Sequence, residues 1–120
     1  MSQIQATTKI LGNAGEKKVA EYLQKQGFTI CAYNFFCRYG EIDLIASKKE
    51  LMVFVEVKTR TTKTDFMHDL ISFSKQQKMI KTMKHYCSTL TQEYALRFDV
   101  AFVYDDTIEY IEGAFTPDHY

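Results

Sequence analysis

Two apolar runs separated by four polar residues dominate the middle of the chain and leave few choices of local structure. The runs are Ile42 to Ala46 and Leu51 to Val57, and the second is rich in β-branched and aromatic residues. The residues between them, 47–50, are few enough for a tight turn, so the sequence predicts a β-hairpin. Because successive side chains of a strand alternate between its faces, the register decides what this hairpin can do.

A turn at residues 49 and 50 places positions whose numbers sum to 99 opposite each other. In that register Asp43 lies opposite Glu56, and Glu41 lies opposite Lys58. One face of the hairpin is then wholly apolar, whereas three carboxylates and one ammonium group gather at one end of the other face. A slip of one residue would put Asp43 and Glu56 on opposite faces.

The carboxylate cluster has two interpretations. Two carboxylates at ~4 Å repel each other by roughly 4 kcal/mol at an effective dielectric of 20, and one lysine offsets only part of that. A divalent cation would supply the missing charge, and carboxylate oxygens with water suit Mg²⁺ or Mn²⁺. The alternative is a half-exposed edge hairpin whose charges form weak surface ion pairs. The residues of the hairpin leave both interpretations open.

Composition indicates one domain and a balanced charge. The chain has 120 residues, of which 46% are hydrophobic, enough for a single core over residues 1–120 with loose termini at 1–11 and 116–120. The formal net charge is +0, so the chain lacks the overall basic character of many nucleic-acid-binding domains. The charge is uneven, at +5 over residues 48–92 (nine basic, four acidic) and −6 over residues 93–120 (one basic, seven acidic). The middle of the chain could therefore face an anion, or the asymmetry could be that of an ordinary dipolar surface.

The cysteines and the hydropathy exclude several classes of protein. The three cysteines, Cys31, Cys37 and Cys87, form no Cys-x-x-Cys pair, which argues against zinc and favours free thiols in a reducing compartment. Residues 1–11 lack the apolar core of a signal peptide, and no stretch approaches the ~18–20 apolar residues of a membrane span. We therefore expect a cytoplasmic protein with no membrane partner.

The remaining patterns predict an α/β fold with a single mixed β-sheet and helices packed on it, in the order αβββαββ. Helix patterns cover residues 13–26 and 73–90, with Asn13 and Ser72 or Ser74 as candidate caps. Strand patterns outside the hairpin cover residues 28–36, 97–104 and 107–111. Asp99, within an apolar run, requires a partner, for which Arg97, Arg38 or a lysine is available.

Other polar residues are candidates for a site. Glu16 lies on the inward stripe of the first helix, where it could join the carboxylate cluster or satisfy a backbone N–H at the helix start. A loop of about a dozen residues follows Lys58, and loops of that length are often functional. Candidate phosphate contacts, each with a solvated surface residue as the alternative, are Arg38, Arg60, Lys75, Gln76 and Lys78.

Taken in order, these motifs resemble the YraN-like family of small uncharacterised bacterial proteins, which is grouped with restriction-endonuclease-like, Holliday-junction-resolvase-like nucleases. The resemblance runs from about Gly12 to Phe115. The motifs that carry it are Gly15-Glu16, Asn34, Cys37-Arg38, Gly40-Glu41-Ile42-Asp43-Leu44-Ile45-Ala46, Phe54-Val55-Glu56-Val57-Lys58-Thr59-Arg60, Lys75-Gln76, Arg97-Phe98-Asp99-Val100 and Ala114-Phe115.

The resemblance implies a nuclease core of the PD-(D/E)XK type. Asp43 corresponds to the first acid, Glu56 to the second and Lys58 to the lysine, and the carbonyl of Val57 would complete a site for Mg²⁺ or Mn²⁺. Glu16 corresponds to the acidic residue that this fold often adds from its first helix. The implied activity is metal-dependent hydrolysis of DNA phosphodiester bonds in branched or non-duplex DNA, with Lys58 assisting the attacking water.

The sequence also departs from the family pattern. Ile42 stands where the motif's name has proline, and Phe36 stands where a basic residue is common, which removes one phosphate contact. Since a fold does not fix a function, a non-catalytic nucleic-acid- or protein-binding module that keeps the nuclease fold is the alternative. DNA is the expected partner, and a homodimer or a protein partner stays open.

Overall fold

The computed structural model describes residues 14–60 and 71–116. The predicted cap at Asn13, the termini beyond these ranges and most of the loop after Lys58 lie outside the described residues. Within them the element order is the predicted αβββαββ, and its elements are α2 (Ala14–Lys25), β1 (Thr29–Cys37), β2 (Gly40–Lys48), β3 (Leu51–Arg60), α3 (Phe73–Cys87), β4 (Ala95–Tyr104) and β5 (Thr107–Phe115).

The five strands form one sheet in the order β1-β2-β3-β4-β5. Neighbouring strands are antiparallel except for β3 and β4, which run parallel and are joined through α3. The expected single mixed sheet is thus confirmed. A parallel pair cannot be closed by a tight turn, which explains why a helix stands between these two strands.

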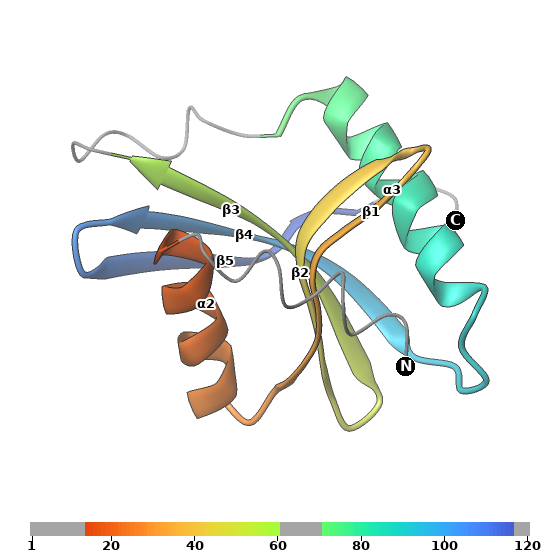
Figure 1. The fold of residues 1–120 in the computed structure, drawn as a ribbon, viewed down its shortest axis with the longest axis horizontal. Coiled ribbons are helices and arrows are strands. Elements are labelled where there is room, and N and C mark those ends of the chain that lie inside the picture. Colours follow the sequence, from red (N-terminus) through yellow and green to blue (C-terminus); the bar gives the residue numbers. More distant parts are fainter. Residues whose placement is uncertain (1–13, 61–70, 117–120) are drawn as a thin grey trace.

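The two helices belong to two separate apolar cores of the sheet (Figure 1). Val19, Ala20 and Leu23 of α2 pack with Val53 and Val55 of β3. On the other side, Met79, Ile80 and Met83 of α3 pack with the buried rings of β3 and β4, Phe54 and Phe98 among them. Each helix buries the apolar stripe that its 3.6-residue period predicts.

The second helix ends three residues earlier than predicted, at Cys87 instead of Leu90. After Ser88 the chain tightens, because Thr89 N–H donates to Tyr86 O and Leu90 N–H donates to Cys87 O, both three residues back. At the start of α3 the cap is Ser72, whose side chain accepts a hydrogen bond from Lys75 N–H at 3.1 Å.

The predicted hairpin register is confirmed from Lys48↔Leu51 to Leu44↔Val55, with Lys49 in the turn at a φ of 55°. Beyond Leu44 the ladder between β2 and β3 stops, and Figure 1 shows the two strands diverging. The expectation that Asp43 and Glu56 face each other as a ladder pair is therefore wrong in detail, because they lie where the sheet has already opened.

The β1–β2 pair also twists at this point. Strand alternation places Ile42 and Leu44 on the same, apolar face of the predicted hairpin. In the structure Ile42 packs in the core of α3, whereas Leu44 packs in the core of α2. The opposing strand explains the change, because Asn34 adopts a φ of 46° between the pairs formed by Tyr33 and Phe35. Asparagine tolerates this left-handed backbone better than most residues.

Asp99 is fully buried and has the partner that the sequence required. Arg97 donates to both carboxylate oxygens, at 2.9 and 3.0 Å. The hydroxyl of Tyr110 donates at 2.6 Å and the N–H of Gly113 at 2.9 Å, both from β5. Burial and the neighbouring carboxylate raise the pKa of Tyr110. This network joins β4 to β5 next to the bulge between Phe98 and Val100.

None of the helices in the described part of the chain has the length and apolar composition needed to cross a membrane.

Candidate active site

Two carboxyl groups meet where β2 and β3 separate. Asp43 projects from β2, and its Oδ2 accepts a hydrogen bond from the backbone N–H of Val57 at 2.8 Å. Glu56 precedes Val57 on β3, and its carboxyl group lies close enough to that of Asp43 for the two charges to interact. The diverging strands thus replace ladder bonds with a bond from the backbone to a side chain, and this bond fixes the Asp43 carboxyl group beside Glu56.

Both carboxyl groups are held in a poorly hydrated place. Burial, followed by the charge of Asp43, raises the pKa of Glu56 to about 7, although Lys75 and Lys58 act in the opposite direction. Burial also raises the pKa of Asp43, against the hydrogen bond from Val57. Near neutral pH the two groups therefore do not both ionise freely, which is the behaviour of adjacent carboxyls that lack a counter-charge.

Glu16 reaches the same place from the first turn of α2. Its side chain is buried, with a residue exposure of 6%, and its Oε1 accepts a hydrogen bond from Asn34 Nδ2 at 2.7 Å. Burial raises the pKa of Glu16, and the charges of Asp43 and Glu41 raise it further. The charge interactions with Asp43 and Glu41 show that Glu16 lies near the carboxylate cluster.

Asn34 was not predicted as part of the site. It is 5% exposed, holds Glu16 and adopts the left-handed backbone that redirects the β1–β2 pair. The signal in the sequence was an asparagine inside an otherwise apolar strand. Asparagine is unfavourable at such a position unless its amide group has a buried hydrogen-bond partner.

Two lysines border the carboxyl pair. Lys58 lies two residues after Glu56 on β3, and its charge lowers the pKa of Glu56. Lys75, in the first turn of α3, places its Nζ 3.8 Å from Glu56 Oε2. Lys75 was predicted as a DNA contact, and the fold puts it within the carboxylate site itself.

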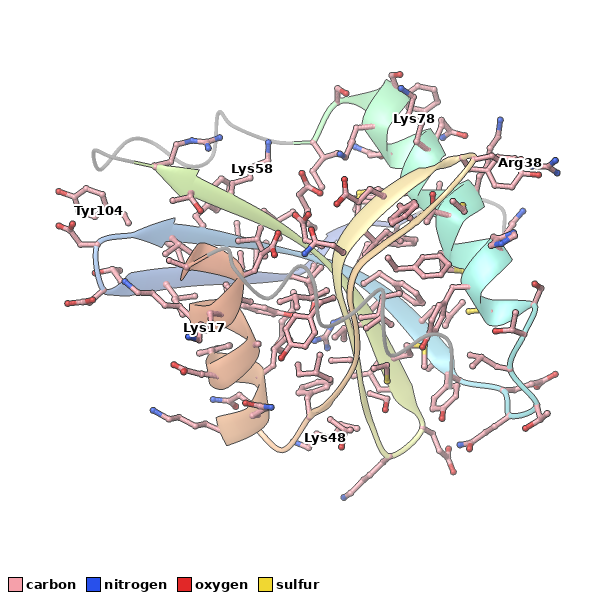
Figure 2. All side chains as sticks on the ribbon, viewed as in Figure 1. Lys17, Arg38, Lys48, Lys58, Lys78 and Tyr104 are labelled. Carbon is pink, nitrogen blue, oxygen red and sulfur yellow. The ribbon has the colours of Figure 1, made fainter. Side chains whose placement is uncertain are left out.

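The other predicted phosphate contacts lie apart from the carboxyl pair. Gln76 Nε2 donates to the backbone O of Ile71 at 3.0 Å, so this amide is occupied in shaping the start of α3. Arg60 Nη1 donates to the backbone O of Thr59 at 2.9 Å. Arg38 and Lys78 are exposed, and Figure 2 shows them with Lys58 along the upper side of the molecule in that view.

The donor set suits a hard cation with few protein ligands. Within residues 14–60 and 71–116, no group of three His, Cys, Asp or Glu side chains is arranged to hold a metal ion. Mg²⁺ commonly takes one or two carboxylates and completes its shell with water and substrate phosphates. Asp43 and Glu56 can supply the two carboxylates, and the carbonyl of Val57 can supply a third oxygen. Because Lys75 and Lys58 offset only part of the cost of ionising this pair, a cation would be accepted there.

Comparison with known proteins matches residues 15–103 to the family described as "Uncharacterised protein family UPF0102". A UPF0102 protein of Caldanaerobacter subterraneus subsp. tengcongensis is 46% identical over 98 residues, covering 80% of each chain. One of Thermodesulfovibrio yellowstonii is 42% identical over 106 residues, covering 88% of this chain and 95% of its own. One of Psychromonas ingrahamii is 41% identical over 108 residues, covering 87% and 88%.

Proposed function

Because the chain belongs to the uncharacterised UPF0102 family, as the YraN-like resemblance predicted, its site is the best guide to its activity, and we propose that it is a metal-dependent nuclease that hydrolyses DNA phosphodiester bonds. The observation that carries this proposal is the Asp43–Glu56 pair, two half-buried carboxyls that lie beside each other with lysines at their edge. Arg97 holds Asp99 through two short hydrogen bonds, at 2.9 and 3.0 Å, whereas Lys75 lies 3.8 Å from Glu56 and only partly offsets the charge of the pair.

The residues that would hold Mg²⁺ or Mn²⁺ are Asp43, Glu56 and the carbonyl of Val57. The N–H of Val57 points at Asp43, and the N–H and C=O of one strand residue point toward the same neighbouring strand. The Val57 carbonyl therefore faces the opening in which the carboxyls lie. A bound Mg²⁺ would polarise a phosphoryl oxygen and acidify a water molecule.

The protein's own groups supply the remaining parts of the reaction. Lys58 stands next to the pair and serves to orient the attacking water or to stabilise the negative charge that develops on the phosphate. Glu16, held by Asn34 and with a pKa raised by burial, lies close enough to exchange a proton with water at the site. Lys75 keeps Glu56 in place and adds positive charge where a phosphate would enter.

We expect the substrate to be branched or otherwise non-duplex DNA. Recognition by shape fits this chain, because the candidate contacts, Arg38, Arg60 and Lys78, are the type of residue that binds phosphates and positions a nucleic acid without reading its bases.

The direct test is cleavage of end-labelled DNAs in Mg²⁺ and in Mn²⁺, with a four-way junction, a flap, a single strand and a plain duplex. We expect cutting that is lost in Lys58→Ala and in Asp43→Asn. Lys49→Ala is the matched control, because Lys49 is an exposed lysine in the β2–β3 turn, at the other end of β3 from the site. Cutting that persists in Asp43→Asn would refute the assignment. No cutting by the folded wild-type protein would favour the non-catalytic binding module.

A further inference from the structure

The side-chain charges of α3 are all positive. The helix carries four lysines spaced three residues apart and no acidic residue, and these lysines are Lys75, Lys78, Lys81 and Lys84. At 1.5 Å per residue, the first and last are separated by about 14 Å along the helix axis. Lys75 lies at the carboxyl pair, whereas Lys78, Lys81 and Lys84 are exposed to solvent. The row of charge therefore begins at the candidate active site and leads away from it while winding half a turn around α3, since each step of three residues falls about 60° short of a full turn.

The far end of this row borders a hollow of ≈ 400 Å³ lined by Tyr39, Lys81, Lys84, His85 and Ser88. The rings of Tyr39 and His85 stand edge to face in this hollow, with their centroids 6.2 Å apart. The guanidinium of Arg38 lies 4.9 Å from the centroid of the Tyr39 ring, and its Nη2 donates to the Tyr39 hydroxyl at 2.7 Å. Two rings and several cations thus border the hollow, and within residues 14–60 and 71–116 no acidic side chain lines it.

Tyr39 lies in a turn that packs closely against α3. The β1–β2 turn sits directly on α3, since a Cβ added to Gly40 would come 3.2 Å from Thr82 Oγ1 and 3.4 Å from Lys78 Cβ. Gly40 also has a φ of +154°, which L side chains rarely adopt. A fixed ring loses little conformational entropy when a ligand stacks on it.

We propose that this surface, formed by the Tyr39–His85 hollow and the lysines of α3, binds an unpaired nucleic-acid strand and leads it to the carboxyl pair. The inference rests on the proposed nuclease function and narrows its substrate to one with a single-stranded part. A plain duplex offers mainly phosphates to a convex helix face, whereas an unpaired strand offers both phosphates for the lysines and bases for the rings. The charge of α3 alone would suit either substrate, and the rings at its end favour the unpaired strand.

Binding can be measured without cleavage, by fluorescence anisotropy of labelled oligonucleotides in EDTA. The probes are a single-stranded DNA, an RNA of the same sequence and the corresponding DNA duplex. We expect the single strands to bind more tightly than the duplex, and the comparison of DNA with RNA identifies which strand is preferred. Tyr39→Ala should weaken single-strand binding by about fivefold or more, the loss of one stacked base, and Tyr39→Phe should restore most of it.

The contribution of the lysines is measured separately, from the salt dependence of the binding affinity. The double variant Lys81→Ala, Lys84→Ala should lower the slope of log affinity against log salt by about 0.7 for each lysine removed. The matched control is Lys17→Ala, Lys25→Ala, which removes two exposed lysines from α2, a helix that packs in the other core of the sheet, and should change nothing. Tighter binding of the duplex, or unchanged single-strand binding in Tyr39→Ala with its fold retained, would overturn the inference.

Failure of this inference is distinguishable from failure of the nuclease function. If Asp43→Asn abolishes cleavage while Tyr39→Ala binds and cleaves like the wild type, the carboxyl pair is catalytic and the surface of α3 has no such role. If Tyr39→Ala loses binding while no variant or wild-type protein cuts DNA, the surface binds a strand in a protein that is not a nuclease.

Discussion

Replacing Glu56 with glutamine should stabilise the metal-free protein at neutral to alkaline pH while abolishing the proposed nuclease activity. Burial and the neighbouring Asp43 raise the pKa of Glu56 from an ordinary value of 4.5 to about 7. The folded protein therefore binds a proton on Glu56 over a pH window in which the unfolded chain has already released it. Stability must fall as the pH rises through that window, and the loss is complete above the folded-state pKa.

The size of the effect follows from the two pKa values. Each pKa unit corresponds to ~1.4 kcal/mol, so ionising Glu56 in the folded state costs about 3 kcal/mol at a pH above 7, with the attractions of Lys75 and Lys58 already included. Glutamine resembles the protonated acid and can still donate to Asp43. We therefore expect Glu56→Gln to raise the Tm by about 10 °C at alkaline pH and to leave it nearly unchanged below the ordinary carboxyl pKa.

The assay is thermal unfolding in EDTA across this pH range, followed by circular dichroism. Glu50→Gln, which neutralises an exposed acid in the β2–β3 turn, serves as the control and should give the same Tm as the wild type at every pH. Adding Mg²⁺ at alkaline pH should stabilise the wild type and not Glu56→Gln, because a ligand that binds only the folded state adds to its stability. A variant no more stable than the wild type at alkaline pH would refute the account of Glu56 as a carboxylate in need of a cation.

Three further predictions concern the scaffold. Asp99→Ala should lower the free energy of unfolding by about 3–5 kcal/mol in urea titrations, because it leaves the Arg97 guanidinium without its buried partner; a loss below 1 kcal/mol would contradict the reading of this pair as structural. Ser72→Ala should cost about 1 kcal/mol by loss of the helix cap, whereas Ser74→Ala, inside the helix, should cost less, and the reverse order would place the cap at the wrong serine. Phe54→Ala should lose about 3–5 kcal/mol by opening a cavity between α3 and the sheet, and retention of the wild-type Tm would show that the core repacks.

The local sequence determined the elements and their order along the chain. Alternation of apolar and polar residues identified the strands, and the 3.6-residue stripes identified the helices, because each pattern reflects which side of one element can be buried. The register of the β2–β3 hairpin followed from its short turn, and a slip of one residue would have moved Leu44 or Val53 out of the core of α2 to the opposite face of the sheet. The need of Asp99 for a cation followed from the cost of burying a lone charge.

The geometry of the candidate site depended on contacts between segments far apart in the chain. Asn34 binds Glu16 across 18 positions, and the first turn of α3 brings Lys75 to Glu56 of β3. No local pattern encodes such distances, because they depend on how the helices and strands pack together.

From the sequence by itself came the two carboxyls on neighbouring strands, the lysine that follows them and the family to which the chain belongs. Only the tertiary structure decided that β2 and β3 separate where these carboxyls lie, that Glu16 and Lys75 join them, and that Tyr39 and His85 meet at the other end of α3. The reason is that a strand pattern fixes which face a side chain takes, whereas the left-handed turn at Asn34 and the packing against two helices fix where that face finally points.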